Sequence, residues 1–547
     1  MSINKRREEP YRYVEMKKEA HTNFMGAPSY DINSPILRLI CMSASSFFGE
    51  PSYYKGMKPE RKNRKLRSYG GHSTLSNTDR NYLRKVLNAV DDYAWRNMST
   101  QEAMEKAIDE ALDYNPEATL QWAVALRREE FIRATPQVIL VRAAQHPKVR
   151  GTGLIRQYAP GVIGRADEPA TQLAYLLASY GKPVPNALKR AWKDYLLKCK
   201  DYQLAKYRME SRVVKTVDVA NLAFGFGGKK QDGAIGRLLR GELSLGGTYK
   251  TWESIISGGG SWEEAIEVMG HMALLRNIRN LLKAGAPREL WLKKLVATAE
   301  RGKQLPFRYL SAFNANKGAP GDVLDAIEEC LELSVGNLPT LNGRSLVLTD
   351  NSGSAHGCPI SELSTMTVAQ IGNLMGVLTA MISDEGYVGV FGDTLKTEAI
   401  RKRASIMDQS NRMNRLGGTV GGGTEHGIWL ALDKAIKQKE HWDNIFVYSD
   451  MQAGHGGLFG TNPRLYRDYL WKGQSRYNSR YIDVPKLVAE YRNKVNSKVN
   501  VFLVQIAGYE DTLLPEYYDR TYIIGGWSGS ILKFAKRMID TADCYQQ

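Results

Sequence analysis

The stretch LVLTDNSGSAHG, residues 346–357, decides how the second half of the chain folds. A run of apolar residues ends on Asp350, and Ser352 and Ser354 follow at alternate positions in a glycine-rich turn. A short apolar run closed by Asn, Ser and Gly is typical of a buried strand followed by a turn. The stretch therefore predicts a strand that ends in one carboxylate and two hydroxyls.

Strands and helices alternate from this point to the end of the chain. The short apolar runs are RSLVLTD, YVGVFGD, NIFVYSD, VNVFLVQIAG and RTYIIGG, and the amphipathic stretches are STMTVAQIGNLMGVLTAMIS, GIWLALDKAIKQ, DVPKLVAEYRNKV and SILKFAKRMIDTA. This alternation predicts a largely parallel, doubly wound sheet with helices on both faces, whose ligands bind at the carboxyl ends of the strands. We expect this α/β domain to span residues 341–547.

Five oxygen-bearing side chains lie in loops that such a sheet brings to one edge. They are Asp350, Ser352, Ser354, Thr424 in GGGTEHG, and Asp450 at the end of NIFVYSD. Hard oxygen ligands suit Mg²⁺, with Mn²⁺ as the alternative, better than zinc or copper. Such a cation would keep an open position for a carboxylate or phosphate oxygen of a partner. The competing interpretation is that DNSGS forms only an Asx turn with helix caps.

Helical spacing dominates the first part of the chain, from about residue 33 to residue 333. Apolar residues recur at i, i+3 or i+4 and i+7 in RNYLRKVLNAVDDYAW, EAMEKAIDEAL, ATLQWAVALRREEFIRA, PQVILVRAAQ, PATQLAYLLASYG, NALKRAWKDYLLKC and WEEAIEVMGHMALLRNIRNLLKAG. Short helices in series without strands between them predict an α-solenoid of HEAT or armadillo type.

The charge of the chain is unevenly distributed. Residues 341–547 hold 23 Lys and Arg against 21 Asp and Glu, which leaves 52 basic and 37 acidic residues for the first 340. The balance is therefore +2 for the α/β part and +15 for the helical part. Such asymmetry indicates a polyanionic partner of the basic part, and the alternative is charge that serves solubility alone.

Two sets of motifs carry a resemblance to a known family. DNSGS, GGGTEHG and VYSD resemble the metal-ion-dependent adhesion site of von Willebrand factor A domains. NFMGAPSYDINSPILRL, SSFFGEPSYY, RATPQVILVRAA, RADEPATQLAYLLASYGKPVPNALKRAW and YQLAKYR resemble the TROVE module of the Ro autoantigen family, in particular its bacterial members. The resemblance implies a TROVE module over residues 1–340, in which a ring of HEAT-like repeats is closed by a von Willebrand factor A-like domain over residues 341–547.

The same resemblance implies a function in RNA quality control. In the Ro family, 3′ ends of misfolded non-coding RNA enter the ring and Y RNA binds a basic outer surface. The implied protein is a cytoplasmic RNA-binding protein rather than an enzyme, with an exoribonuclease such as polynucleotide phosphorylase as a further partner. Two alternatives stay open, a metal-dependent hydrolase acting on RNA and a protein-binding scaffold that uses the metal site.

One segment combines the residue types that RNA binding needs, basic groups for phosphates and flat side chains for bases. This segment, residues 189–215, is here called the basic segment. Its candidate RNA contacts are Lys189, Arg190, Lys206, Arg208, Arg212 and Lys215, and Lys193, Trp192, Tyr195, Tyr202 and Tyr207 lie between them. By resemblance to a TKYK-like helix, Lys206 and Arg208 are the candidates for Y RNA contacts. The alternative is that the aromatic residues form core and the basic ones a solvated face. Phe224 stands where animal members carry a histidine.

Other chemistry finds little support in the sequence. GFGGKKQ lacks the spacing of a phosphate-binding loop, and the chain has no HExxH motif. The five cysteines form no CxxC pair, and no apolar run of about 18 residues could span a bilayer. The beginning of the chain is charged and lacks an apolar signal core, so we expect a cytosolic protein.

Overall fold

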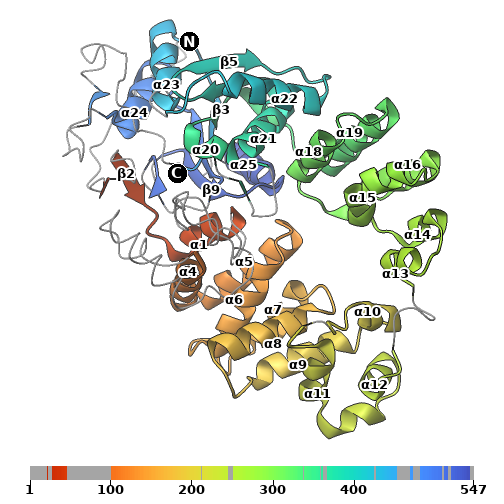
Figure 1. Ribbon diagram of the computed structural model, residues 1–547. Helices are drawn as coiled ribbons and strands as arrows, with labels where there is room; N and C mark the ends of the chain where they lie inside the picture. Colours follow the sequence, from red (N-terminus) through yellow and green to blue (C-terminus); the bar gives the residue numbers. More distant parts are fainter. Residues whose placement is uncertain are drawn as a thin grey trace, which may run out of the picture. The chain divides into compact units, whose positions relative to one another are not determined.

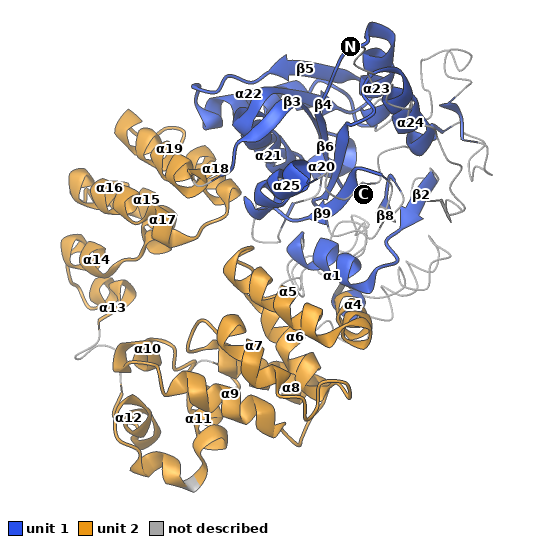
Figure 2. Cartoon of the chain, turned by 180° about the vertical axis from the view of Figure 1, so that it is seen from behind, with its two compact units in different colours: residues 1–103, 337–547 blue, residues 104–336 orange. Residues whose placement is uncertain are grey.

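The computed structural model describes residues 21–22, 28–45, 100–210, 212–243, 250–336, 338–357, 359–360, 366–423, 427–451, 469–471, 481–507, 511–514 and 519–541. The chain divides into two compact units, which Figure 2 colours separately. The sheet unit comprises residues 1–103 and 337–547, and the helical unit comprises residues 104–336.

A six-stranded mixed sheet forms the centre of the sheet unit (Figure 1). Its strands are β3 (Leu341–Asp350), β4 (Ser383–Phe391), β5 (Leu395–Ala399), β6 (Asn444–Ser449), β7 (Asn500–Gln505) and β9 (Thr521–Gly525). Their order in space is β5-β4-β3-β6-β7-β9, and β5 alone among these six runs antiparallel to its neighbour. The predicted, largely parallel sheet is therefore confirmed.

Helices cover both faces of this sheet. They are α1 (Pro35–Ala44), α20 (Gly353–Gly357), α21 (Val368–Ile382), α22 (Ile406–Gly417), α23 (Gly427–Gln438), α24 (Val484–Lys494) and α25 (Ser530–Thr541). Leu346 and Leu348 of β3 join the buried cluster that includes α23 and α24. Val347 and Thr349 point the other way, since both lie next to Gly376 of α21. The alternation of side chains along β3 thus buries it on both faces.

A segment from the beginning of the chain belongs to the sheet unit. Strand β2 (Pro28–Asp31) pairs antiparallel with β1 (His21–Thr22) and with β8 (Asp511–Thr512). Helix α1 packs on β9, where a Cβ on Gly525 would lie only 2.7 Å from the Cα of Cys41. Glycine is required there because the helix backbone lies directly on the strand. The predicted module boundary at residue 340 stays a prediction.

The helical unit is a series of short helices. They are α4 (Thr100–Tyr114), α5 (Pro116–Arg128), α6 (Ala134–Gln145), α7 (Leu154–Val162), α8 (Glu168–Ser179), α9 (Asn186–Leu196), α10 (Asp201–Lys206), α11 (Thr216–Phe224), the 3-10 helix η2 (Gly225–Lys230), α12 (Ala234–Arg240), α13 (Trp252–Ser257), α14 (Trp262–Val268), α15 (His271–Lys283), α16 (Arg288–Ala297), α17 (Ala299–Gly302), α18 (Pro306–Ala315) and α19 (Gly321–Val335). From α5 to α9 each helix contacts another helix one or two places along the series. The helical rhythm of the sequence is confirmed, and the assignment to HEAT repeats stays a prediction.

Two expected helices are interrupted. The stretch ATLQWAVALRREEFIRA is helical only as far as Arg128, because Phe131 has a positive φ of 56° that a continuous helix does not allow. The stretch from residue 262 to residue 285 breaks at Met269 and Gly270, whose extended backbone separates α14 from α15. The expected helix over residues 80–95 lies outside the described residues.

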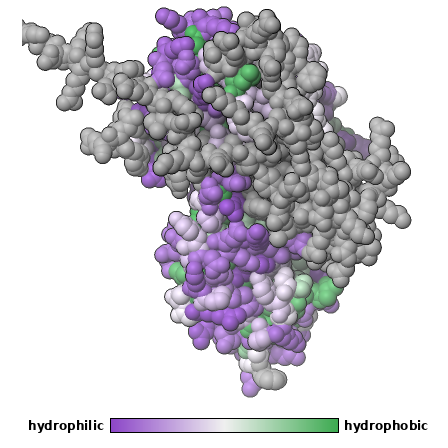
Figure 3. Space-filling model, turned by 90° about the vertical axis from the view of Figure 1, so that its left-hand side faces the viewer, coloured by the Kyte–Doolittle hydropathy of each residue, from purple (hydrophilic) through white to green (hydrophobic). Residues whose placement is uncertain are grey.

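The described surface of the helical unit is mostly hydrophilic on the side that Figure 3 shows. The large apolar side chains of the helical unit that reach solvent include Leu197 and Val213. Of the helices in the described ranges, none is long and apolar enough to cross a membrane.

Candidate functional site

The carboxyl ends of β3 and β6 meet where the strand order changes direction. After β3 the chain proceeds to β4 and β5 on one side, and β6 then pairs with the other side of β3. Ligands of open α/β sheets bind at such a switch point. Asp350 is the last residue of β3 and Asp450 follows β6 directly, so the topology brings these two carboxylates to that point.

Asp350 is completely buried and held on both oxygens. Its Oδ1 accepts a hydrogen bond from the backbone N–H of Ser352 at 2.9 Å, and its Oδ2 accepts one from Ser449 Oγ at 2.7 Å. Burial raises the pKa of the Asp350 carboxyl above its ordinary value, and the hydrogen bonds from Ser449 and Ser352 oppose part of that rise. A divalent cation beside this carboxylate would favour its charged form.

A chain of oxygen atoms links the two strand ends. Ser352 Oγ lies 2.9 Å from Ser354 Oγ, which donates to Asp450 Oδ2 at 3.2 Å. Four of the five predicted ligands thus lie together, and Thr424 lies outside the described residues. Within the described ranges, no group of three or more His, Cys, Asp or Glu side chains could hold a metal. A cation at this edge would therefore depend on the serine hydroxyls as well as on the carboxylates.

The basic segment is distributed over helices α9 and α10 and the residues that follow. Lys189 and Arg190 lie on α9, and the backbone of Arg212 follows α10 in an exposed stretch. The Lys206 ammonium lies 5.7 Å and 5.8 Å from the ring centroids of Tyr202 and Tyr207, within the range of a cation–π contact. Lys206 therefore lies beside two aromatic rings that remain at least partly accessible.

Two other residues of the basic segment already have an acidic neighbour. Arg208 Nε lies 2.8 Å from Glu210 Oε1 and Lys215 Nζ lies 3.3 Å from Glu210 Oε2, while Arg208 also donates to the carbonyl of Leu243. Although slight burial acts in the opposite direction, Lys215 and Arg208 hold the pKa of Glu210 below its ordinary value. The Arg208 side chain consequently stabilises the local fold in addition to any contact with a ligand.

Trp192 differs from the other aromatic residues of the segment. It is completely buried, and its Nε1 donates to Gln172 Oε1 at 2.6 Å. A ring in this position cannot stack on a base, so the interpretation of Trp192 as core is correct. Phe224 lies under Lys193, whose Nζ is 5.4 Å from the ring centroid.

Comparison with known proteins gives a match among solved structures. No family model and no curated protein matches the chain. The crystal structure of the Ro (RSR) protein of Deinococcus radiodurans superposes with a TM-score of 0.52 at 15% sequence identity, over 92% of this chain and 99% of that one. The chain has the Ro fold. At this identity the shared property is the fold, with its mostly helical part and its mixed six-stranded sheet.

In this Ro fold, a buried amide network that the motifs do not reveal supports the edge of the sheet. Asn373 of α21 donates to Asn351 Oδ1 at 2.9 Å and to Asn414 Oδ1 at 2.8 Å, and it accepts from Thr349 Oγ1 at 2.7 Å. Asn351 lies between Asp350 and Ser352, so the network fixes the turn from which both project. A lone asparagine within the apolar helix sequence VAQIGNLMGVLTAMI was the available signal.

The glycine-rich loop is fixed in a similar way. Asp393 accepts hydrogen bonds from the backbone N–H groups of Gly422 and Gly423 at 3.2 Å and 2.9 Å, and Gly353 donates to the carbonyl of Gly422 at 2.7 Å. Gly421 has a φ of 88°, in the left-handed region that favours glycine. The strand-end carboxylate of Asp393 thus holds the loop that leads toward Thr424.

Proposed function

We propose that the chain is an RNA-binding protein of Ro type that binds small non-coding RNA through its helical unit. The observation that carries the proposal is the extent of the match to the Deinococcus radiodurans Ro protein, which covers 92% of this chain and therefore both of its units. The charge balance of +15 over the first 340 residues supports it independently, because a phosphate backbone needs basic partners. On this proposal, residues 1–340 form a TROVE module of HEAT-like repeats and residues 341–547 form a von Willebrand factor A-like domain.

The basic segment is the proposed RNA contact. Lys206 stands beside two aromatic rings, so that one position offers a charge for a phosphate and a flat surface for a base. Lys189, Arg190 and Arg212 would add phosphate contacts, whereas Arg208 and Lys215 would have to share their charge with Glu210. The proposed RNAs are Y RNA and the 3′ ends of misfolded or processed RNAs, bound in the cytoplasm for quality control. An exoribonuclease such as polynucleotide phosphorylase is the proposed protein partner.

We further propose a divalent cation at the edge of the sheet, with Mg²⁺ ahead of Mn²⁺. The oxygen-only set of Asp350, Ser352, Ser354 and Asp450 fits a hard cation, and the hydrogen-bonded chain of these oxygens supports this assignment. Thr424 would complete the set. When bound, the cation would offer a Lewis-acidic position to a carboxylate or phosphate oxygen of a partner, while the buried Asn351 network keeps the ligands in place.

Incubation of the full chain with labelled small RNA and Mg²⁺ tests the proposal. Stable retention of intact RNA, weakening steeply with added salt, is the expected result, since each neutralised phosphate contributes roughly 0.7–0.9 to the log–log slope. Cleavage of the RNA would instead support the metal-dependent hydrolase. Absence of binding at moderate salt would support the protein-binding scaffold.

A further inference from the structure

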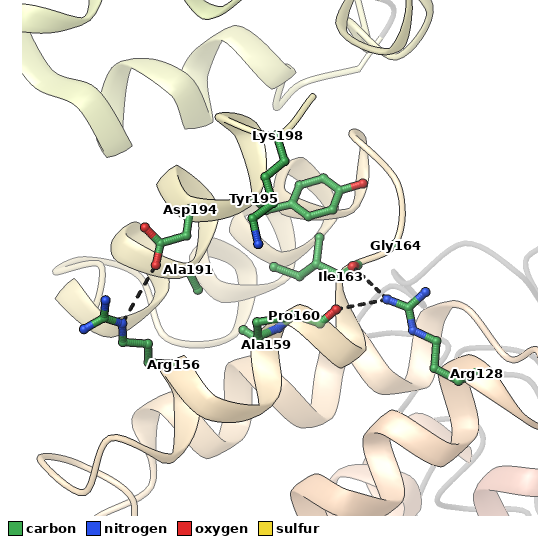
Figure 4. A pocket seen from close by; sticks show the side chains of 10 residues that line it. All are labelled: Arg128, Arg156, Ala159, Pro160, Ile163, Gly164, Ala191, Asp194, Tyr195 and Lys198. Atoms are coloured by element: carbon green, nitrogen blue, oxygen red, sulfur yellow. Dashed lines mark hydrogen bonds and ion pairs between the residues drawn. The ribbon is translucent and has the colours of Figure 1, made fainter. Parts of the chain in front are cut away.

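A pocket of about 220 Å³ opens among helices α5, α7 and α9 of the helical unit (Figure 4). Its apolar lining is formed by α7, the two residues after it, and α9. The lining residues of this kind are Ala159, Pro160, Ile163, Gly164 and Ala191. Tyr195 of α9 adds an aromatic ring above Ile163 in the view of Figure 4. The pocket therefore offers one apolar and aromatic surface within a largely hydrophilic unit.

One wall of the pocket is held rigidly. The Arg128 guanidinium of α5 donates to the carbonyl oxygens of Gly161, Pro160 and Ile163 at 2.7 Å, 3.0 Å and 3.3 Å. These carbonyls belong to the C-terminal end of α7, where hydrogen bonds and a positive charge are both favourable. The shape of the pocket thus exists before any ligand enters, which lowers the entropic cost of binding.

The remaining polar groups stand around the apolar surface. Arg156 Nε lies 4.0 Å from Asp194 Oδ2, with side chains 81% and 52% exposed, and Lys198 is exposed on the same rim. An ion pair so long and so exposed contributes little stability. Arg156 can therefore exchange Asp194 for a phosphate at small cost, and the Asp194 carboxylate is then available to accept a hydrogen bond.

We propose that this pocket takes one unpaired nucleotide of a bound RNA and prefers a base with an exocyclic amino group. The inference rests on the RNA binding proposed above. The base would lie against Tyr195 and the apolar surface, as unpaired bases do on aromatic side chains, and Arg156 and Lys198 would contact its phosphates. An ionised carboxylate only accepts hydrogen bonds. Asp194 can pair with the amino group of cytosine but not with the O4 carbonyl that uracil presents at that position.

Cytosine and uracil give the cleanest comparison because they have the same size. The probes are one RNA hairpin with a single-stranded tail of about five cytidines and the same hairpin with a tail of about five uridines, a length within the range of single-strand binding sites. We expect the full chain to bind the cytidine tail roughly tenfold more tightly. The D194N variant should bring this ratio close to one, because the asparagine amide can donate to uracil O4 as well as accept from cytosine.

Two further variants complete the experiment. Asp322→Asn is the matched control, since Asp322 pairs with Arg288 at 3.1 Å with both side chains 47% exposed, and it should keep the wild-type ratio. Lys198→Ala should weaken both tails by the same factor, because a phosphate contact does not read the base. Thermal unfolding of each variant establishes that it is folded.

Each outcome bears on a different claim. If the wild type binds the two tails equally, or if Asp194→Asn keeps the wild-type preference for cytidine, the proposed nucleotide pocket is refuted. Salt-dependent binding of the hairpin in that case still supports the proposed RNA-binding function. Failure of the wild type to bind either hairpin at low salt would overturn both.

Discussion

The edge of the six-stranded sheet and the basic segment of the helical unit both gather polar side chains, but in opposite environments. At the sheet edge Asp350, Ser352 and Asp450 are buried, and hydrogen bonds fix their positions. In the basic segment Lys206 and Arg208 are partly accessible, and their neighbours are rings, a single glutamate and the carbonyl of Leu243. The buried sheet edge suits a small cation, which several ligands coordinate at the same time. The accessible basic segment suits a long polyanion, which is bound by many weak contacts.

The largest expected effect is the loss of metal binding at the sheet edge without any loss of RNA binding in the helical unit. Asp350→Ala should abolish binding of Mg²⁺ or Mn²⁺ at the sheet edge, because it removes the carboxylate that orients the turn and supplies charge near the ion. RNA binding by the basic segment should be unchanged. Isothermal titration with Mn²⁺ and an RNA shift assay measure the two properties.

The matched control is Asp384→Ala. Asp384 accepts from the backbone N–H of Gly343 at 2.8 Å, at the opposite end of β3, and its removal should leave metal uptake intact. Equal Mn²⁺ uptake by Asp350→Ala and wild type would refute the metal site. Joint loss of metal and RNA binding in a folded Asp350→Ala protein would refute the independence of the two regions.

The second prediction divides the basic segment itself into core and surface. Trp192→Ala should lower the free energy of unfolding by about 3–5 kcal/mol, because it empties a completely buried site and leaves Gln172 without its donor. Tyr202→Ala, at a ring that is 37% exposed, should cost less than about 1 kcal/mol. Urea unfolding of both variants measures their free energies of unfolding. Equal decreases in the two variants would contradict the assignment of Trp192 to the core and Tyr202 to the surface.

The third prediction concerns the contribution of charge to RNA binding. Replacing Lys206 and Arg208 together by Ala should reduce the slope of log affinity against log salt by roughly one to two units. Arg208 also donates to the carbonyl of Leu243, so its removal could disturb the local fold. The single variant Lys206→Ala keeps that hydrogen bond and therefore tests the RNA contact alone. An unchanged slope in a folded double variant would place the RNA elsewhere on the molecule.

The smallest expected effect is the pH dependence of stability that arises from a buried histidine in the helical unit. His271 Nδ1 lies 3.0 Å from the carbonyl of Leu295, to which it donates, and in the neutral ring Nε2 accepts from the Tyr309 hydroxyl at 3.0 Å. Burial lowers the pKa of His271 below its ordinary value, although the hydrogen bond to Leu295 opposes part of this shift. The folded state therefore binds this proton less readily than the unfolded state does.

The sign of the pH dependence follows from this difference. The stabilising effect of neutral His271 is complete above about pH 6.5 and is lost as the pH falls below it, at no more than about 1.4 kcal/mol per pH unit. Unfolding measured between pH 8 and pH 5 should show this loss in the wild type. A profile that is flat in the wild type would contradict the assignment of a neutral buried ring.

The grouping of polar side chains at the sheet edge was largely predictable, because the residues that mark each strand end are adjacent in the sequence. A strand that ends in Asp and a second parallel strand that ends in Asp must meet when the two strands are neighbours, and β3 and β6 pair along Ser345–Thr349. The strands and most helices were likewise visible in the spacing of apolar residues. The interruption at Phe131 was not, because apolar spacing continues through a residue whose backbone leaves the helical region.

The basic segment was less predictable because burial decides the role of each residue there. The spacing of Trp192, Tyr202 and Tyr207 along the chain gives no indication that the first belongs to the core. A buried chain of hydrogen bonds determines it, since Trp192 donates to Gln172, and Gln172 donates to Gln137 Oε1 at 2.6 Å. These bonds join residues that are 20 and 35 positions apart, and tertiary packing brings such residues together, so no local sequence pattern indicates them.

The pairing of β2 with β8 has a consequence for synthesis of the chain on the ribosome. Ser29 donates to the carbonyl of Thr512, 483 positions later. At roughly 5–20 residues per second, the early strand is exposed for roughly 25–100 s before its partner exists. Throughout that time its unpaired backbone groups could pair with another nascent chain. The sheet unit can thus be completed only after residue 512 has been synthesised, whereas the helical unit, whose contacts join residues that are closer in sequence, can fold before that point.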